Sequence, residues 1–218
     1  MKISVVRNVL EANDRIAQQN KDLFDKTGVL VINLMSSPGA GKTSLLERTI
    51  EALRDDLAIG VIEGDIQTSQ DAERIAKKDV AVVQINTDGA CHLDGNMIRG
   101  TLDRFDLRSL DLLVVENVGN LVCPAEFKVG EDLKAMILSV AEGDDKPSKY
   151  PLMFRESEVL LINKIDLLPY VDCSMEKMVA DSRGINAGLH IFEVSCKTGQ
   201  GLEGWYEWLR EKVKAKRG

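Results

Sequence analysis

One segment near residue 40 restricts the possible folds of this chain more than any other. An apolar run at residues 29–35 leads into the loop SSPGAGKT, residues 36–43, and a helical pattern follows at residues 44–54. A buried strand, a glycine-containing loop and a helix in this order are typical of a phosphate-binding loop. Gly39 and Gly41 let backbone N–H groups face phosphate oxygens, and the helix N-terminus adds partial positive charge. The segment therefore predicts a P-loop NTPase.

Two side chains of this loop carry the expected chemistry. Lys42 would reach the β- and γ-phosphates, and the Thr43 hydroxyl would bind the Mg²⁺ that bridges them. The other predicted nucleotide contacts in the loop are Gly39, Ala40, Gly41 and Ser44. Ser36 stands where the usual pattern has its first glycine, so we expect slight strain in the turn there.

Apolar runs rich in valine, isoleucine and leucine recur along the rest of the chain. They predict buried strands at residues 57–62, 80–85, 110–115, 133–140, 159–162 and 189–194. Helical patterns lie between them, at residues 69–77, 93–105, 174–183 and 202–214. Such strands, alternating with helices, are typical of a mostly parallel sheet with helices on both faces. We therefore predict a single α/β domain over residues 1–218, with a helical arm at 1–28 and a G domain at 29–218.

Two segments of this domain have further expected features. The arm would end at Thr27-Gly28, because glycine after the last turn is a common stop signal for a helix. Its apolar face is predicted, from helical spacing, to consist of Val6, Val9, Leu10, Ile16, Leu23 and Phe24. The charged stretch at residues 142–150 contains a proline and predicts an exposed loop.

The composition disfavours several classes of partner. A net charge of -7 and a pI near 5.0 argue against nucleic acid, whose phosphates require a basic face. No apolar run reaches the roughly 18 residues of a membrane-spanning helix, and the opening residues lack the order of a signal peptide. The four cysteines are too scattered for a secreted disulfide framework. We therefore expect a cytoplasmic protein that binds neither membrane nor nucleic acid.

A second motif identifies the expected base. A predicted strand ends in Asn163-Lys164-Ile165-Asp166, which matches the N-K-x-D guanine motif. The Asp166 carboxylate can accept from both N1–H and the 2-amino group of guanine, whereas adenine would leave the charge unpaired. Asn163 would face the guanine edge or brace the phosphate loop, and the stem of Lys164 would lie on the ring. Ser195-Cys196-Lys197 is similar to the S-A-K loop of GTPases, so GTP and GDP are the expected nucleotides.

Two acidic residues follow predicted strands at the same edge of the sheet. Glu116-Asn117-Val118-Gly119 is similar to the D-x-x-G switch of GTPases, and Asp65 should reach the same carboxyl edge. With Lys42 these acids form the predicted catalytic set, and with Thr43 they form the predicted Mg²⁺ site. The alternative for either acid is an N-cap of the following helix, and Asp71 is interpreted as a helix-face charge. Since no glutamine is placed to orient the attacking water, slow intrinsic hydrolysis is expected.

Soft metal ligands occur in two loops near this edge. Cys91-His92 and Cys123-Pro124 each follow a predicted strand. Two thiolates and an imidazole favour Ni²⁺ or Zn²⁺ over Mg²⁺, and they leave a position open for water or a second subunit. Glu116 stands only seven residues before Cys123, so nucleotide state and metal affinity are expected to be coupled. From spacing alone, two small buried cysteines and a loop histidine are the favoured alternative.

Six segments together resemble the hydrogenase nickel-insertion GTPases, the HypB family of SIMIBI-class P-loop proteins. They are SSPGAGKTSLLE, EGDIQTSQDAERI, INTDGACHLDGNMI, VENVGNLVCPAEF, LLINKIDLLPY and EVSCKTGQGLEGW, and they cover essentially the whole chain. The resemblance implies a GTP-dependent homodimer that binds nickel or zinc between subunits through Cys91, His92 and Cys123. It also implies a HypA-like nickel-binding partner and delivery of the metal to the large subunit of NiFe-hydrogenase.

Two alternatives to this metal-delivery GTPase stay open. A urease accessory GTPase shares much of the fold, but that family has a C-P-H triplet where this chain has Cys123-Pro124-Ala125. A GTP-dependent binding switch without a metal role would tolerate loss of the thiols. Some HypB proteins also carry an N-terminal nickel-binding cysteine motif or a histidine-rich tract. This sequence has neither, and its histidines are His92 and His190, so nickel storage is not expected.

Overall fold

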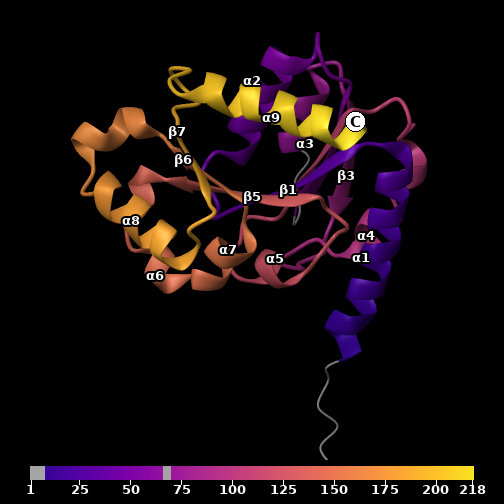
Figure 1. Ribbon diagram of the computed structural model, residues 1–218, viewed down its shortest axis with the longest axis horizontal. Helices are drawn as coiled ribbons and strands as arrows, with labels where there is room; N and C mark the ends of the chain where they lie inside the picture. The colour runs from indigo at the N-terminus through magenta and orange to yellow at the C-terminus, as the bar shows by residue number, and fades with distance from the viewer. Residues whose placement is uncertain (1–7, 66–69) are drawn as a thin grey trace, which may run out of the picture.

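In the computed structural model, which describes residues 8–65 and 70–218, seven parallel strands form one central sheet (Figure 1). They are β1 (Leu30–Ser36), β2 (Ile59–Asp65), β3 (Ala81–Asn86), β4 (Leu112–Glu116), β5 (Leu133–Ser139), β6 (Val159–Asn163) and β7 (His190–Glu193). Their spatial order is β3-β2-β4-β1-β5-β6-β7. The predicted mostly parallel sheet is confirmed, and each strand falls within two residues of its predicted start.

Helices cover both faces of the sheet, as predicted (Figure 1). On one face lie α2 (Lys42–Leu53), α3 (Gln70–Ala76) and α9 (Leu202–Arg217). On the other lie α1 (Asn8–Thr27), α4 (Gly95–Arg99), α5 (Cys123–Glu126), α6 (Lys146–Lys149), α7 (Pro151–Glu156) and α8 (Met175–Ile185). Short 3-10 turns occur at η1 (Leu102–Arg104), η2 (Val140–Glu142) and η3 (Ile165–Tyr170).

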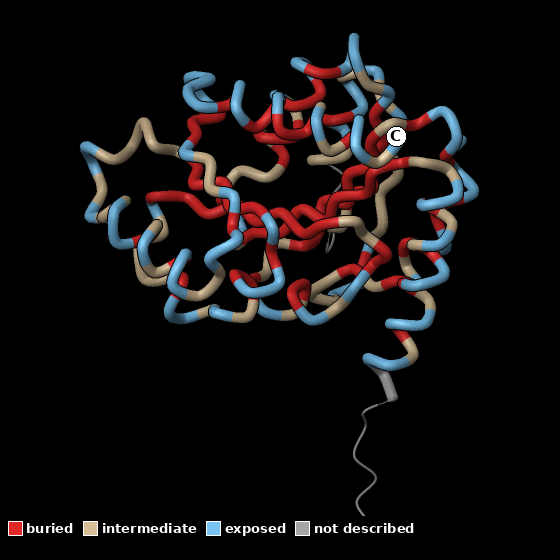
Figure 2. Tube along the Cα trace, in the orientation of Figure 1, coloured by how far each residue is buried: buried red, intermediate tan, exposed pale blue. Residues whose placement is uncertain are grey.

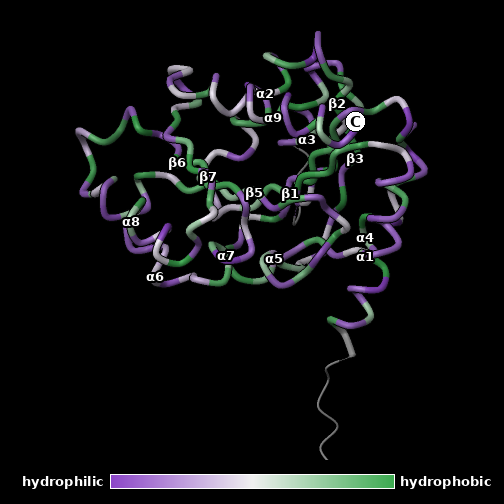
Figure 3. Tube along the Cα trace, in the orientation of Figure 1, coloured by the Kyte–Doolittle hydropathy of each residue, from purple (hydrophilic) through white to green (hydrophobic). Residues whose placement is uncertain are grey.

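The five inner strands form the core, whereas the two edge strands do not. Every residue of β1, β4, β5 and β6 is buried, and so are the first five of β2 (Figure 2). Hydropathy follows the same pattern, with apolar strands inside and polar outer helix faces (Figure 3). The expectation of buried strands was wrong for β3 and β7, whose ends are exposed because each pairs with a neighbour on one side only.

Several predicted helices differ from the observed ones. The predicted helix at residues 93–105 is divided into α4 and η1. Asp94 caps the start of α4 by accepting from the Met97 backbone N at 2.8 Å, and Gly100 is the residue at which α4 ends. The start predicted at Ser69 lies outside the described residues. None of the helices in the described ranges is long and apolar enough to cross a membrane.

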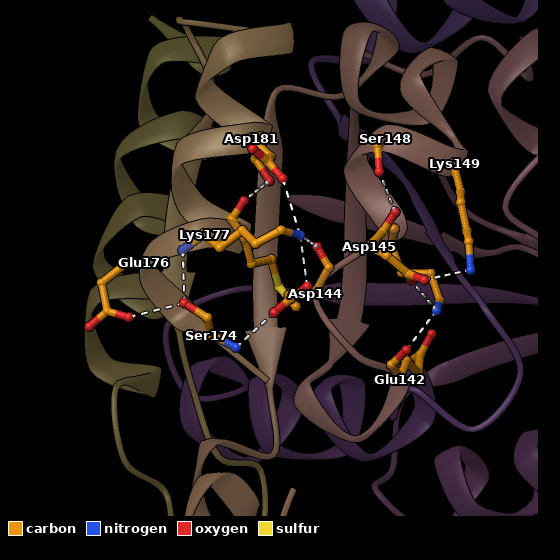
Figure 4. A network of polar contacts seen from close by, with 12 residues as sticks. Glu142, Asp144, Asp145, Ser148, Lys149, Ser174, Glu176, Lys177 and Asp181 are labelled. Carbon is orange, nitrogen blue, oxygen red and sulfur yellow. Dashed lines mark hydrogen bonds and ion pairs between the residues drawn. The ribbon is translucent and has the colours of Figure 1, made fainter. Parts of the chain in front are cut away.

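The stretch at residues 142–150 is not the exposed loop that its charges predict. It contains α6, whose Pro147 is buried, and a polar network joins it to α8 (Figure 4). Asp144 accepts from the Ser174 backbone N at 2.9 Å and forms an ion pair with Lys177 at 2.8 Å. Because Ser174 and Lys177 at the start of α8 provide partners, the charged residues of this stretch attach it to α8.

The N-terminal helix α1 packs through a face that apolar spacing identifies only in part, since Phe24 of the predicted face is buried and Leu23 packs against the core. Its buried residues recur at helical spacing and are Asn13, Ala17, Asn20 and Phe24. Asn20 donates to the backbone oxygens of Gly95 and Val129, at 2.8 and 3.1 Å. Leu10, predicted on the apolar face, is 42% exposed, whereas Val6 and the side chain of Val9 lie outside the described residues. Hydrogen bonds from buried asparagines thus replace part of the expected apolar contact.

Candidate nucleotide and metal site

The loop between β1 and α2 has the shape of a phosphate cradle. Gly39 and Gly41 have φ values of 77° and 108°, which favour glycine, and α2 begins at Lys42, two residues earlier than predicted. Lys42 and Thr43 therefore occupy the first helical turn. Ser36 ends β1 as a regular strand residue, so the expected strain at that position is wrong. Its hydroxyl oxygen accepts from Lys42 Nζ at 2.9 Å.

Asn163 joins the phosphate loop to the predicted base loop. Its Nδ2 donates to the Ala40 backbone oxygen at 2.9 Å, and its Oδ1 accepts from the Cys196 backbone N at 3.1 Å. Of the two roles considered for Asn163, the brace of the phosphate loop is the one observed. Lys164, at φ 63°, also donates to this loop, from Nζ to the Gly39 backbone oxygen at 2.7 Å.

Asp166 lines the pocket that the base motif forms. One carboxylate oxygen accepts from the Ser195 hydroxyl at 2.6 Å, which fixes its orientation. The pocket measures about 330 Å³ and is lined by Gly41, Ser44, Asn163, Lys164, Asp166, Leu167, Cys196 and Lys197. The structure therefore brings the predicted base-binding residues, distant in sequence, to one cavity.

The second predicted centre contains an acidic pair of which sequence reasoning found only one member. Glu116 Oε1 accepts from the Thr43 hydroxyl at 2.8 Å. Glu63 lies opposite Glu116 in the register of β2 and β4, and both are 3% exposed. The predicted strand ends at residue 62, and the acid predicted after it is Asp65, which lines the same pocket of about 270 Å³. Only the register, which sequence does not give, identifies Glu63.

The electrostatics of this pair favour a bound cation. Burial, with the charge of Glu116 beside it, raises the pKa of Glu63 to about 10. Burial also raises the pKa of Glu116, against the opposing effect of Lys42. Glu63 Oε1 and Glu116 Oε2 are buried and have no hydrogen-bond partner among the described residues. Buried carboxylate oxygens left in this state fit a hard divalent cation such as Mg²⁺.

A third pocket connects the other two. It measures about 280 Å³ and shares Gly41, Ser44 and Lys164 with the base pocket. It shares Gly39, Lys42, Asp71 and Glu116 with the acidic pocket. Asp71 accepts from Arg74 at 3.0 Å on the same helix, as a helix-face charge would, but it also faces the phosphate end of this groove. The groove is thus continuous from the base motif to the acidic pair.

The three soft ligands converge as predicted, beside the acidic end of the groove. Ligand atoms of Cys91, His92 and Cys123 all lie within 4.8 Å of one another. The two sulfurs are 3.0 Å apart, and Cys91 Sγ lies 3.7 Å from His92 Nδ1. All three residues are half-buried, which differs from the fully buried cysteines of the alternative interpretation.

The surroundings of the cluster favour the metal-binding form of His92, whereas Cys123 would become a thiolate only when a cation is bound. Burial lowers the pKa of His92, so its imidazole stays neutral and keeps a lone pair for a metal. The ring also lies against Phe127, with centroids 3.8 Å apart, which fixes its plane. The hydrogen bond to Cys91 raises the pKa of Cys123, as two thiols without a cation should do to each other. A thiophilic divalent ion fits this donor set.

The nucleotide-binding core matches a family model described as the CobW/HypB/UreG nucleotide-binding domain, over residues 30–193. Those bounds run from the start of β1 to the end of β7 and include the P-loop, the N-K-x-D motif and the three soft ligands. The fold and the site thus define a P-loop nucleotide-binding protein of the CobW/HypB/UreG class.

Within this class, the chain is similar to particular known proteins. The hydrogenase maturation factor HypB of Azotobacter vinelandii is 47% identical over 210 residues, which are 96% of this chain and 69% of that protein. HypB from Helicobacter pylori, solved in complex with nickel, is 38% identical with a TM-score of 0.89, covering 94% of this chain and 97% of that one. The chain belongs to the HypB family of hydrogenase maturation factors.

A more distant likeness concerns the fold alone. The signal recognition particle receptor FtsY from Elizabethkingia anophelis is 13% identical, with a TM-score of 0.57 over 94% of this chain and 74% of that one. The shared sheet agrees with the predicted SIMIBI-type domain.

Proposed function

We propose that this protein is a GTP-hydrolysing metallochaperone that couples its nucleotide state to nickel or zinc binding during hydrogenase maturation. The observation that carries the proposal is the position of the soft ligands. The thiol-imidazole cluster adjoins the same sheet edge as the groove for a nucleotide, and Asn117 and Leu93 join the two places by a hydrogen bond of 2.9 Å. The nickel complex of the Helicobacter pylori relative supports nickel as the cargo.

The chemistry of the base pocket supports guanine. Asp166 is held by Ser195 with a carboxylate facing the pocket, where it would accept two N–H groups of guanine. We predict that Asp166→Asn shifts preference from GTP toward XTP, because xanthine offers an acceptor to the new amide. Competition of both nucleotides against a fluorescent GDP analogue measures this. An unchanged preference for GTP would refute the base assignment.

The phosphate end of the groove supports hydrolysis of GTP to GDP and phosphate. Lys42 and the backbone N–H groups of the loop would hold the β- and γ-phosphates, and Thr43, Glu116 and Asp65 would hold Mg²⁺ directly or through water. When bound, Mg²⁺ supplies positive charge that offsets the negative charge growing on the phosphates. Glu63 would complete the acidic side of this centre, since it lies beside Glu116.

The partners follow from the incomplete metal site. Cys91, His92 and Cys123 supply three donors, and a second copy of the chain, joined when GTP is bound, would supply the remaining ligands. A HypA-like protein would load the nickel, and the large subunit of NiFe-hydrogenase would receive it. The exposed Val122, directly before Cys123 and 50% exposed, is consistent with contact to another protein here.

Calorimetry of Ni²⁺ and Zn²⁺ binding tests the proposal. Wild type and Cys91→Ala/Cys123→Ala are titrated with GDP and with a non-hydrolysable GTP analogue. Cys173→Ala, which removes a half-buried thiol outside the cluster, is the matched control. We expect metal binding to be lost in the double variant and kept in wild type and Cys173→Ala. In the proteins that bind, the affinity should differ between GDP and the GTP analogue.

The other results point to different functions. Metal binding that is unchanged in the double variant would favour a GTP-dependent binding switch without a metal role. A urease accessory GTPase is the less supported alternative, since the Azotobacter vinelandii relative is a HypB protein and Cys123-Pro124-Ala125 lacks the histidine of the C-P-H triplet.

A further inference from the structure

We propose that Asn117 is the positioning residue through which the nucleotide site adjusts the soft metal cluster, while Lys134 holds the other half of the cluster in place. The inference rests on the function proposed above and names the residues that carry its coupling. It starts from the fact that the three ligands come from two loops. Cys91 and His92 lie in one, and Cys123 begins α5 in the other.

Asn117 connects the acidic pair to the first loop. It follows Glu116 directly and is fully buried. Its Oδ1 accepts from the backbone N of Leu93, the residue after His92, and from the backbone N of Val118, both at 2.9 Å. Its Nδ2 donates to Asn33 Oδ1 on β1 at 3.0 Å. A buried amide with these bonds cannot release Leu93 without leaving polar groups unpaired, so the two residues move together.

Leu93 touches the acidic centre a second time, through its side chain. It is fully buried and packs on Gly64, which lies between Glu63 and Asp65. A Cβ placed on Gly64 would be 2.7 Å from Leu93 Cδ1, so the contact leaves no spare room. The residue beside His92 is therefore fixed to the ends of both acid-bearing strands, β2 and β4.

The second loop is held from a different place. Lys134, on β5, is 6% exposed and donates from Nζ to the backbone oxygens of Ala125 and Pro124, at 2.6 and 3.3 Å. Glu131 lies 3.7 Å from the same Nζ. Lys134 lines none of the three pockets of the groove. Lys134 therefore fixes the turn that begins at Cys123, and it does so away from the groove that would hold the nucleotide.

The two supports together explain how a small shift could change metal affinity. A cation and phosphates at the acidic pair would draw Glu116 and Glu63 to new positions, and Asn117 and Leu93 would pass the shift to Cys91-His92. Cys123 would stay where Lys134 holds it, so the coupling would run through Cys91-His92 and not, as the spacing between Glu116 and Cys123 suggested, through Cys123 itself. The separation between the two halves of the cluster then changes, and metal affinity depends steeply on that separation.

The test compares Asn117→Ala with Lys134→Met by Ni²⁺ titration calorimetry, each with GDP and with a non-hydrolysable GTP analogue. In wild type we expect Kd for Ni²⁺ to differ by about 5-fold or more between the nucleotides. Asn117→Ala should bring that ratio to within about 2-fold of one. Lys134→Met should weaken Ni²⁺ binding by the same factor in both states and leave the wild-type ratio. A merely structural role for Asn117 would not equalise the two states.

Reciprocity provides a second readout, because Ni²⁺ must change nucleotide affinity by the same factor as nucleotide changes Ni²⁺ affinity. Fluorescent GDP titrations with and without Ni²⁺ measure it. Asn117→Ser, which keeps a polar group in the buried site but is too short to reach Leu93, replaces Asn117→Ala if the alanine variant does not fold. If the Asn117 variants keep the wild-type ratio of Ni²⁺ Kd values between the two nucleotides, or if Lys134→Met loses that ratio, this inference is overturned while the proposed function stands. Equal Kd values in wild type would overturn the proposed coupling as well.

Discussion

The two ends of the parallel strands differ in how their charged residues are paired. We call the side where the strands begin the amino edge and the side where they finish the carboxyl edge. At the amino edge, Asp132 precedes β5 and accepts from the Val31 backbone N at 2.8 Å, from Lys216 at 2.5 Å and from Lys21 at 3.1 Å. Asp111 precedes β4 and pairs with Arg217 at 2.6 Å. At the carboxyl edge, the buried acids Glu63 and Glu116 adjoin each other, and one oxygen of each lacks a partner in the described chain.

The difference separates a structural edge from a binding edge. A pocket of about 400 Å³ also lies near the amino edge, between α1 and the start of β5, but charges of both signs line it and two ion pairs, Lys21–Asp132 and Lys134–Glu131, form among them. A hollow alone therefore does not identify a site. Two buried adjacent acids with unpartnered oxygens cost stability at neutral pH, because one of them must hold a proton there, and such a pair is typical of a site that a ligand completes.

Lys42→Ala tests the binding edge and has the largest expected effect. The variant lacks the charge that would face the β- and γ-phosphates, so we expect GTP hydrolysis to fall by at least about 1,000-fold. Phosphate release at saturating GTP measures this, and circular dichroism shows whether the variant is folded. Hydrolysis at the wild-type rate would contradict a phosphate role for this edge.

Glu63→Gln tests whether the acidic pair costs stability without its cation. An unfolded Glu63 loses its proton near 4.5, whereas the folded pKa is about 10, so the folded state holds the extra proton between these values. Stability of the metal-free protein should therefore fall as pH rises from about 5 to about 9, by up to about 1.4 kcal/mol per pH unit.

Chemical denaturation with EDTA at several pH values measures this slope. Glu63→Gln removes the titrating group, so its free energy of unfolding should exceed that of wild type at pH 8 and vary less with pH. The same variant should bind Mg²⁺-GTP more weakly. A slope in the variant as steep as in wild type, or steeper, would show that the buried pair is not the cause.

Asp132→Ala tests the structural edge and has the smallest expected effect. The side chain is 13% exposed and accepts from a backbone N and two lysines, so its loss should cost about 2 kcal/mol of unfolding free energy. GDP affinity should not change. Asp56→Ala, which breaks the exposed pair with Arg210, is the control and should cost less than about 0.5 kcal/mol. Weaker GDP binding in Asp132→Ala would contradict a purely structural role for the amino edge.

Local motifs made much of the fold and site predictable from sequence. The phosphate loop and the N-K-x-D motif each lie in one stretch of chain, and the three soft ligands occur in loops that follow parallel strands. Parallel strands place such loops at one edge, so the fold class puts Cys91, His92 and Cys123 at the same edge, whereas their approach to within 4.8 Å of one another is seen only in the structure.

Features that depend on pairing between distant residues were not predictable. Glu63 is significant only because β2 and β4 are neighbours in a register that places it beside Glu116. Lys134 lies inside an apolar run, and only its contact with the end of α5 explains a buried lysine there. Part of the packing face of α1 was not predictable for a related reason. Asn13 and Asn20 are buried through hydrogen bonds, which the spacing of apolar residues does not reveal.

Asn163 has a consequence for redesign. Its amide bonds to Ala40 in one loop and to Cys196 in the other, and a Cβ on Gly41 would lie 2.5 Å from its Nδ2. An engineer who grafts a base-reading loop of another specificity onto this scaffold must therefore bring a matching phosphate loop with it. The exchangeable unit is the pair of loops, because Asn163 is fitted to both, and a graft confined to residues 195–197 would have to keep the backbone N of residue 196 in its present place.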